Sequence, residues 1–374
     1  MFEGYPIYDA DAHVMLCPQM WEDLPGPYRT RRPRPVRIDD SADGGRWHTG
    51  WLIEGRIEPH SYGPGTQGAN TPQHVLEAYG APKEFVGSHD LSDPTARLRD
   101  LDTLGIDVQC MFPSTLYAKM TTDPGFEAAL FRAYNRYMSR QSQTDPKRLK
   151  WAGLLPLADG AQGCEAVQEM AKLGAAAAVV YGTVGERMLS DPGFTRVWDA
   201  LAATGMPLCV HMGMSYPPFV ELCRSRLDAH AIAMSVPALL AFVAVVGHGL
   251  LDQYPNLKVA FLEFGGEWLF YMVGRIEHYL PSYRRDPVTQ RLPEMDVRDY
   301  FRDGRIFLAA EAEDKFMVEE LALLGDGQML YSSDYPHGEG RENAAQELWE
   351  RRDVSAEQKG RIFYDNAVRL FGEP

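Results

Sequence analysis

The chain has 374 residues, of which 45% are apolar and 24% are charged, and its formal net charge is −15. This composition is typical of a soluble globular protein, and the acidic balance argues against non-specific binding to nucleic acid. The length suits a single α/β barrel with an insertion, or two ordinary domains.

The five cysteines are scattered through the chain, and none of them forms a Cys-x-x-Cys pair. An odd number without such pairs argues against a disulfide framework or a zinc knuckle and favours a reducing compartment. The N-terminus carries no basic segment followed by an apolar one, so no signal peptide is expected. We therefore expect a cytoplasmic protein.

Eight short apolar or β-branched segments recur along the chain and are predicted to be strands. Several of them are continuous apolar runs, as in parallel strands that are buried on both faces. Segments with helical periodicity lie between them, and two of these segments end in glycine. This alternation predicts a (β/α)8 TIM barrel of the α/β class. The predicted strands start "YPIYDADA", "IDVQCMF", "LKWAGLLPL", "AAAAVVYG", "PLCVHMG", "LKVAFLEF", "RIFLAA" and "MLYSSD", in chain order.

Residues 29–98 interrupt this alternation after the first strand. They are rich in glycine, proline and polar residues, and Trp47 and Trp51 lie among them. A long insertion at this place in a barrel is usually functional, as a lid or a pocket wall. Because no repeat or linker divides the rest, we expect residues 1–374 to form one barrel domain, with 29–98 as a lid-like insertion within it.

Residues 231–251 contain no formal charge and are long enough to cross a bilayer. Pro237, His248 and two glycines interrupt the segment, and no basic flank marks an orientation. A buried helix at a subunit interface is therefore favoured over a membrane span. We expect no membrane partner, and a homodimer or higher homo-oligomer.

Polar residues stand at the ends of four predicted strands, where barrel side chains point into the mouth of an active site. Imidazole and carboxylate groups that converge there suit a Zn²⁺, Mn²⁺ or Fe²⁺ site with an open position. Taken singly, each residue could be a structural histidine or a turn-forming aspartate. Their joint position favours a metal site. These residues are Asp11 and His13 on the first strand, His211 on the fifth, Glu263 on the sixth and Asp334 on the eighth.

Several stretches together resemble the amidohydrolase superfamily, in the branch of aminocarboxymuconate-semialdehyde decarboxylase and its relatives. The resemblance covers nearly the whole chain outside the insertion, and it implies a distorted TIM barrel with one divalent metal, commonly zinc. The matching stretches begin "DADAHV" at 9, "RLRDLDTLGIDVQCMFPST" at 97, "LLPLADGAQGCEAVQEMAKLG" at 154, "DPGFTRVWDALAATGMPLCVHMG" at 191, "LLDQYPNLKVAFLEFGGEW" at 250, "MLYSSDYPHGEG" at 329 and "IFYDNAVRLFG" at 362.

The resemblance implies Asp11, His13, His211 and Asp334 as the metal ligands. The superfamily usually begins with His-x-His, whereas the first position here is Asp11. A carboxylate at that place favours harder ions, so Mn²⁺ or Fe²⁺ are alternatives to the expected Zn²⁺. Asp9, one alternation further back, would support the site from the barrel interior.

The similar decarboxylases carry a catalytic histidine at the end of the sixth strand, where this chain has Glu263. We therefore expect a metal-dependent hydrolase that attacks a small aromatic or cyclic carboxylate, lactone or amide through a metal-activated water. Asp334 would shuttle the proton, and Glu263 or His337 would serve the leaving group. Glu263 could instead orient a histidine ligand, and His337 could simply pack its loop.

Two other functions are alternatives to hydrolysis. The first is metal-dependent, non-oxidative decarboxylation of an aromatic or unsaturated acid, with Glu263 as the acid if a dry pocket raises its pKa. The second is a barrel that has lost its metal and acts as a binding protein. In each case the expected partner is a small molecule.

Overall fold

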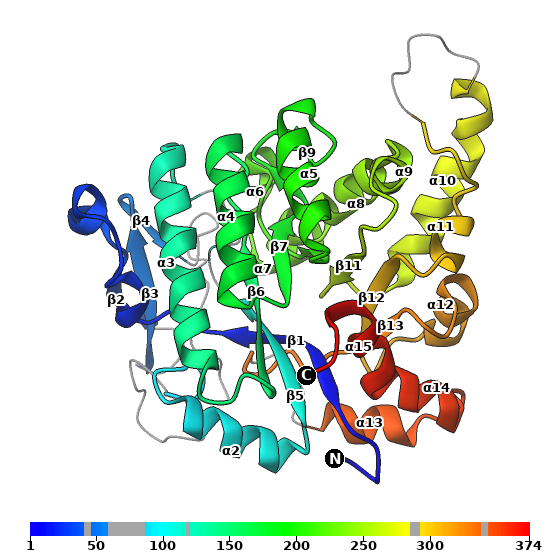
Figure 1. Cartoon of the computed structure of the whole chain (residues 1–374), viewed down its shortest axis with the longest axis horizontal. Coiled ribbons are helices and arrows are strands. Elements are labelled where there is room, and N and C mark those ends of the chain that lie inside the picture. Colours follow the sequence, from blue (N-terminus) through cyan, green and yellow to red (C-terminus); the bar gives the residue numbers. More distant parts are fainter. Residues whose placement is uncertain (41–45, 59–86, 115, 117–119, 285–291, 338–342) are drawn as a thin grey trace.

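The computed structural model describes residues 1–40, 46–58, 87–114, 116, 120–284, 292–337 and 343–374 (Figure 1). Eight strands form one sheet in the order β1-β5-β6-β7-β10-β11-β12-β13, and every pair in it is parallel. Helices surround the sheet, which confirms the predicted barrel. The strands are β1 Tyr8–Val14, β5 Val108–Pro113, β6 Leu149–Leu154, β7 Ala177–Tyr181, β10 Leu208–His211, β11 Val259–Leu262, β12 Ile306–Ala310 and β13 Met329–Tyr331.

The barrel strands are apolar because both of their faces are covered. Every residue of β10 and of β11 is buried, including those that a half-exposed strand would give to water. Such runs are expected where helices pack on the outside of a sheet that closes on itself. The polar exceptions lie at strand ends, and this is where the candidate site forms.

The helices begin and end where local chemistry predicts. Asp123 and Asp159 cap α3 and α4 by accepting backbone N–H groups, and Gly174 ends α4 with a φ of 81°. The helices are α2 Pro94–Leu104, α3 Pro124–Ser142, α4 Gly160–Leu173, α5 Thr195–Thr204, α6 Pro217–Leu222, α7 Arg226–Asp228, α8 Val236–Phe242, α9 Leu250–Gln253, α10 Glu267–Tyr283, α11 Asp299–Arg302, α12 Met317–Leu324, α13 Ala344–Glu350, α14 Ala356–Gly360 and α15 Asn366–Phe371.

The seam between the first and last barrel strands is held by residues beyond the short strand β13. The Asp334 N–H donates to the Asp11 carbonyl at 3.0 Å, and the His13 N–H donates to the Tyr335 carbonyl at 2.7 Å. The Ser333 hydroxyl donates to a carboxylate oxygen of Asp9 at 2.6 Å. Closure of the barrel therefore brings the polar ends of β1 and β13 together.

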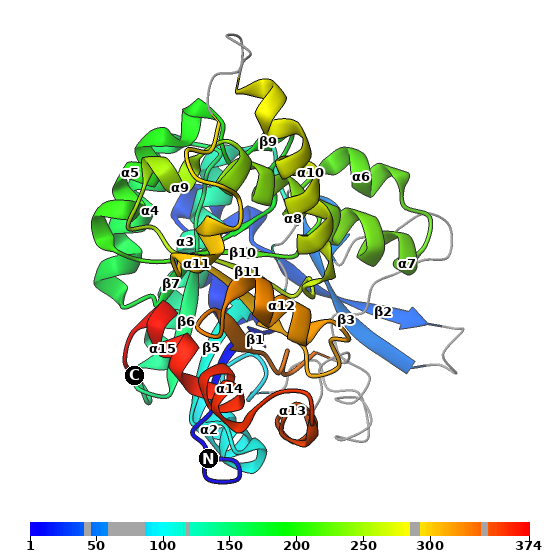
Figure 2. The ribbon, with the colours of Figure 1, turned by 90° about the vertical axis from the view of Figure 1, so that its right-hand side faces the viewer.

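Part of the insertion forms a small antiparallel sheet that extends to one side of the barrel (Figure 2). Its strands are β2 Arg34–Asp40, β3 Arg46–Ile53 and β4 Arg56–Glu58. Trp51 is buried and its ring packs edge-on against Trp21, with 6.4 Å between the ring centroids. Residues 59–86 lie outside the described residues, so a lid over the mouth stays a prediction.

The uncharged segment is helical, as predicted. Ala229–Gly247 is long and apolar enough to cross a bilayer, with a mean hydropathy of 2.2, yet half of it is buried inside the protein. Within it, α8 lies between two π-helical segments, Ala229–Met234 and Val243–Gly247, and packs against β7, β8 (Thr183–Val184) and β10. Length and composition are weak evidence for a membrane span, because core helices share them.

Candidate metal centre

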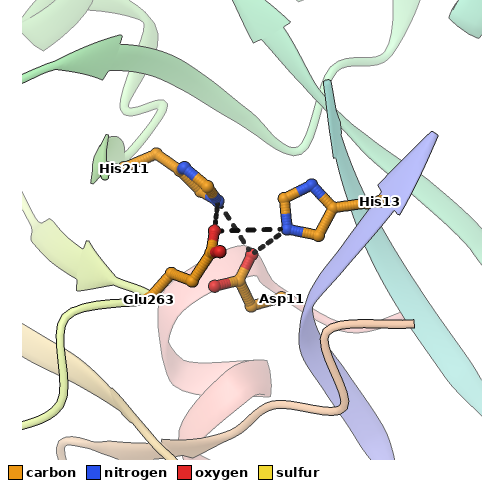
Figure 3. Close-up of side chains that lie close together, drawn as sticks. All are labelled: Asp11, His13, His211 and Glu263. Atoms are coloured by element: carbon orange, nitrogen blue, oxygen red, sulfur yellow. Dashed lines mark ion pairs between the residues drawn. The ribbon is translucent and has the colours of Figure 1, made fainter. Parts of the chain in front are cut away.

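Four side chains from three strand ends converge at the mouth of the barrel (Figure 3). They are Asp11, His13, His211 and Glu263, and their ligand atoms all lie within 4.8 Å of one another. The Nε2 atom of His211 lies 3.0 Å from Glu263 and 3.4 Å from Asp11. The Nε2 atom of His13 lies 3.5 Å from Glu263. This spacing is that of donors that face a common point.

A second group overlaps the first and includes the remaining predicted residues. His13, Glu263, Asp334 and His337 also place one ligand atom each within 4.8 Å of the others. Asp334 Oδ1 lies 3.1 Å from His13 Nε2 and 2.8 Å from His337 Nδ1. The imidazole rings of His13 and His337 stack, with 3.9 Å between their centroids. Among the described residues, the predicted site residues therefore fall into two overlapping groups that share His13 and Glu263, and Glu263, not the predicted ligand Asp334, completes the group of Asp11, His13 and His211.

Glu263 lies closer to the histidines than its predicted role required. The sequence suggested a proton-transfer group or a partner of a ligand, whereas its carboxylate lies 3.0 Å from His211 Nε2 and 3.5 Å from His13 Nε2, and Asp334 lies 3.1 Å from His13 Nε2. The backbone explains this position, because Glu263 and Asp334 both adopt left-handed conformations, with φ of 64° and 54°. Such values are uncommon outside glycine, cost about 1–3 kcal/mol each and cluster at functional sites.

The donor atoms of this cluster fit a divalent ion. Among the described residues, both Asp11 carboxylate oxygens, both His13 ring nitrogens and His211 Nε2 are buried without a hydrogen-bond partner. Buried polar atoms are rarely left so, and a cation bound between Asp11, His13 Nε2 and His211 Nε2 would supply the partner that these three groups lack. The other ring nitrogen of His211 lies 2.9 Å from the Met212 carbonyl oxygen. A proton on that nitrogen leaves Nε2 with its lone pair toward the cluster.

The electrostatics of the cluster lead to the same conclusion. Burial lowers the pKa of His13, but Asp334 and Glu263 outweigh it and raise that pKa to about 9. Burial raises the pKa of Asp11 above its ordinary value, although His211 offsets part of the effect. Buried carboxylates here need positive charge nearby, and a divalent ion supplies it more compactly than protonated imidazoles do.

A hydrogen-bonded chain lies behind the cluster. Arg97 on α2 is fully buried and donates to the His13 carbonyl at 3.0 Å and to the Gln109 side chain at 2.8 Å. Gln109 in turn donates to Asp9 at 2.7 Å. Burial raises the pKa of Asp9 to about 6 although these bonds oppose the shift. These hydrogen bonds hold β1, the strand that carries Asp11 and His13, in its position.

The loop that carries Asp334 is anchored through Tyr335. Its hydroxyl donates to Asp100 on α2 at 2.8 Å and lies 3.0 Å from the Nε2 atom of His89. The guanidinium of Arg97 lies over the Tyr335 ring, 4.7 Å from its centroid. Sequence reasoning assigned no role to Arg97, Gln109, Tyr335 or His89. Arg97, Gln109 and Tyr335 fall within stretches that resemble the superfamily, which was the available signal.

A cavity of about 250 Å³ opens beside the cluster and is lined by Glu263, Asp334 and the acidic residues that follow β12. Burial, and then neighbouring carboxylates, raise the pKa of Glu311 in this wall to about 7. The volume suits a small organic molecule that reaches the metal ligands.

Comparison with known proteins identifies the family. The amidohydrolase family profile matches residues 8–372. The 2-amino-3-carboxymuconate-6-semialdehyde decarboxylase of Dictyostelium discoideum is 22% identical over 289 residues, which cover 75% of this chain and 77% of that protein. The gamma-resorcylate decarboxylase of Polaromonas sp. (strain JS666 / ATCC BAA-500) is 22% identical over 299 residues, which cover 75% and 87%.

Solved structures share the fold at low sequence identity. An amidohydrolase from Mycobacterium avium subsp. paratuberculosis superposes with a TM-score of 0.77 at 21% identity, covering 99% of this chain and 98% of that one. A 5-carboxyvanillate decarboxylase from Novosphingobium aromaticivorans, complexed with manganese, superposes with a TM-score of 0.72 at 17% identity, covering 98% and 96%. The chain therefore belongs to the amidohydrolase family, and it is a metal-dependent hydrolase or decarboxylase of that superfamily.

Proposed function

We propose that this chain catalyses the metal-dependent, non-oxidative decarboxylation of a small aromatic or unsaturated acid. The observation that carries this proposal is the buried, unpartnered donor set at the barrel mouth, in a chain that is similar to two proteins named decarboxylases. The sequence favoured hydrolysis because Glu263 replaces a histidine. The relatives support the decarboxylase alternative better.

Asp11, His13, His211 and Glu263 form one group of ligand atoms that would hold the ion, and Asp334, the fourth ligand expected from the sequence, would reach it from the second group, which shares His13 and Glu263. A divalent ion at this place supplies a Lewis acid for the substrate carboxylate and an adjacent oxygen. With Asp334 and Glu263 both counted, three carboxylates stand against two imidazoles, and such hard donors suit Mn²⁺. The manganese of the 5-carboxyvanillate decarboxylase supports the same choice. We therefore propose Mn²⁺ ahead of the Zn²⁺ that the sequence favoured.

Loss of CO₂ leaves an electron pair on the carbon that carried the carboxylate, and an acid must protonate that carbon. Asp334 and His337 are placed for this task, because Asp334 Oδ1 lies 2.8 Å from His337 Nδ1. At this distance a proton could pass between the two groups during the reaction. Both side chains are mostly shielded from water, with exposed fractions of 16% and 15%, which protects the intermediate from bulk solvent.

Glu263 supports hydrolysis as the second candidate. Its carboxylate lies 3.0 Å from His211 and lines the cavity, where it can accept a proton from an attacking water. Against this role, charged imidazoles at His211 and His13 would lower the pKa of Glu263 despite its burial, and a bound divalent ion would act in the same direction.

One experiment separates the two reactions. Protein loaded with Mn²⁺ is incubated with a panel of aromatic carboxylates and lactones, and release of CO₂ and release of acid are followed in parallel. We expect CO₂ from at least one carboxylate and none after chelation. Acid release from a lactone without CO₂ from any carboxylate would support hydrolysis and contradict the proposal.

A further inference from the structure

The cavity beside the metal centre has an acidic wall. Glu263 and Asp334 line it on the side of the cluster, and Glu311 and Glu313 line it from the loop that follows β12. Among the described residues of this lining there is no lysine or arginine, and the basic side chain there is that of His230. Because the cavity measures about 250 Å³, a small molecule held at the metal would lie against the acidic wall.

A bound divalent ion would offset only part of this negative charge. Glu263 and Asp334 belong to the groups of possible ligand atoms, whereas Glu311 and Glu313 belong to neither group. Burial, and then four neighbouring carboxylates led by Asp314 and Glu313, raise the pKa of Glu311 to about 7. A carboxylate that is surrounded by like charges is stabilised as an ion when a ligand brings a cation beside it.

The loop after β12 presents Glu311 at the barrel mouth. The Glu311 N–H donates to the Asp314 carboxylate at 3.2 Å, and the Asp314 N–H donates to the Glu311 carbonyl at 3.0 Å. Arg351 anchors the same loop, because it donates to the Ala312 carbonyl at 3.0 Å, and it pairs with Asp353 at 2.7 Å. The charge of Arg351 is therefore spent on the backbone and on another acid, while the Glu311 side chain is exposed.

We propose that Glu311 is a specificity-determining residue and that the substrate carries a cationic group, such as a protonated amine, away from its reacting acid group. The inference rests on the proposed function, because the ion would hold the acid group and leave the rest of the molecule against the acidic wall. A second carboxylate at that end would meet like charges there. The substrate class is therefore a zwitterionic acid and not a dicarboxylate.

The test measures binding and uses probes that differ in charge at one end. The 3- and 4-methylbenzoates are neutral there, the 3- and 4-(aminomethyl)benzoates carry a cation, and the matching benzenedicarboxylates carry an anion. Each probe is titrated into Mn²⁺-loaded protein by calorimetry at about pH 8, where Glu311 is mostly ionised. We expect at least one aminomethyl probe to bind about threefold to tenfold more tightly than its methyl counterpart, and the dicarboxylates to bind more weakly.

Glu311→Gln removes the charge and nearly keeps the shape of the side chain. We expect this variant to bind the methylbenzoates as the wild type does and to lose the preference for the cationic probe. Glu319→Gln is the matched control, because Glu319 is an exposed acid on α12 that does not line the cavity. Its preference should equal that of the wild type, since salt at about 0.15 M screens distant charges.

Equal affinities for the methyl and aminomethyl probes in the wild type, a preference that survives in Glu311→Gln, or no binding of any probe would each overturn the inference. An equal loss of preference in Glu319→Gln would also contradict it, because the effect would then come from the net charge of the chain. A preference that depends on Glu311, without CO₂ release from any acid, would leave the inference standing and contradict only the proposed reaction. CO₂ release without such a preference would contradict the inference alone.

Discussion

Asp9 on β1 and Glu320 on α12 are both carboxylates shielded from water, yet their surroundings differ. Each has an exposed fraction of 0%. Asp9 accepts hydrogen bonds from Gln109 and from the backbone and hydroxyl of Ser333. Neither oxygen of Glu320 has a partner among the described residues.

The ionisation of the two groups follows from this difference. Burial raises the pKa of Asp9 to about 6, against the opposing hydrogen bonds, and raises that of Glu320 to about 8, with Asp314 adding to the shift. At neutral pH Asp9 is largely ionised and Glu320 largely neutral. The first serves to position the seam beside the metal centre, whereas the second is tolerated in the fold only with its proton.

The largest effect on activity is expected from substitutions in the candidate metal centre. His211→Ala removes a proposed ligand, and Asp334→Asn removes both a proposed ligand and the proposed proton carrier. We expect each to lower kcat by a factor of about 100 or more, as is common for lost acid–base groups. Steady-state kinetics with metal analysis checks this. Turnover at the wild-type level in either variant would refute the assignment of these residues.

Glu263→Gln separates two roles at the same place. If Glu263 transfers a proton, kcat falls by about 100-fold with the metal retained. If it helps to hold the ion, metal affinity falls by about 10–100-fold and kcat recovers in excess Mn²⁺. The proposed function predicts the second outcome, and a titration of activity against Mn²⁺ decides between them.

Arg97→Met tests whether the hydrogen bonds behind the cluster support metal binding. The variant leaves Gln109 and the His13 carbonyl without their donor, so we expect metal affinity to fall by about 10–100-fold. The free energy of unfolding should fall by about 1–3 kcal/mol. Arg99→Met is the control, because Arg99 lies on the same helix with 66% of its side chain exposed. If Arg97→Met and Arg99→Met bind the metal equally tightly, the hydrogen bonds of Arg97 do not support metal binding.

The smallest effect is expected at Glu320, on stability alone. The folded protein raises the pKa of Glu320 from its ordinary value of 4.5 to about 8. Between these values the folded state keeps a proton that the unfolded chain releases, so stability falls as the pH rises. Glu320→Gln cannot lose this stability. The Tm of the variant relative to that of the wild type should therefore rise between about pH 5 and about pH 8.

Glu319→Gln, an exposed neighbour on α12, is the control for this prediction. Its Tm should follow the wild type at every pH, and the activity of both variants should be unchanged. A difference in Tm between Glu320→Gln and the wild type that does not vary with pH would contradict a proton on Glu320.

Strand ends were the places where the sequence could predict most directly, and it placed Glu263 outside the ligand set, whereas the structure groups Glu263 with Asp11, His13 and His211. Asp11, His13, His211 and Asp334 could be placed together because parallel barrel strands end at one mouth. Alternating apolar runs and capped helices likewise predicted the barrel itself. These are local patterns, and the fold repeats them regularly enough for their ends to meet.

Other features depend on tertiary contacts that no local pattern reports. Glu263 adopts a left-handed backbone conformation, and a glutamate residue does not by itself predict that conformation. Arg97 reads as an ordinary helical arginine until its side chain is seen to bond the carbonyl of His13. The choice of hydrolysis over decarboxylation rested on Glu263 alone, and one substitution is a weak guide to the reaction.

The central claim is tested most directly by metal analysis coupled to CO₂ release. Protein purified without chelator should carry about one equivalent of a divalent ion, and His211→Ala should carry far less. The wild-type protein should release CO₂ from an aromatic acid, lose this activity on chelation and regain it with Mn²⁺. Less than about a tenth of an equivalent of any divalent ion, or CO₂ release that survives chelation, would contradict the account.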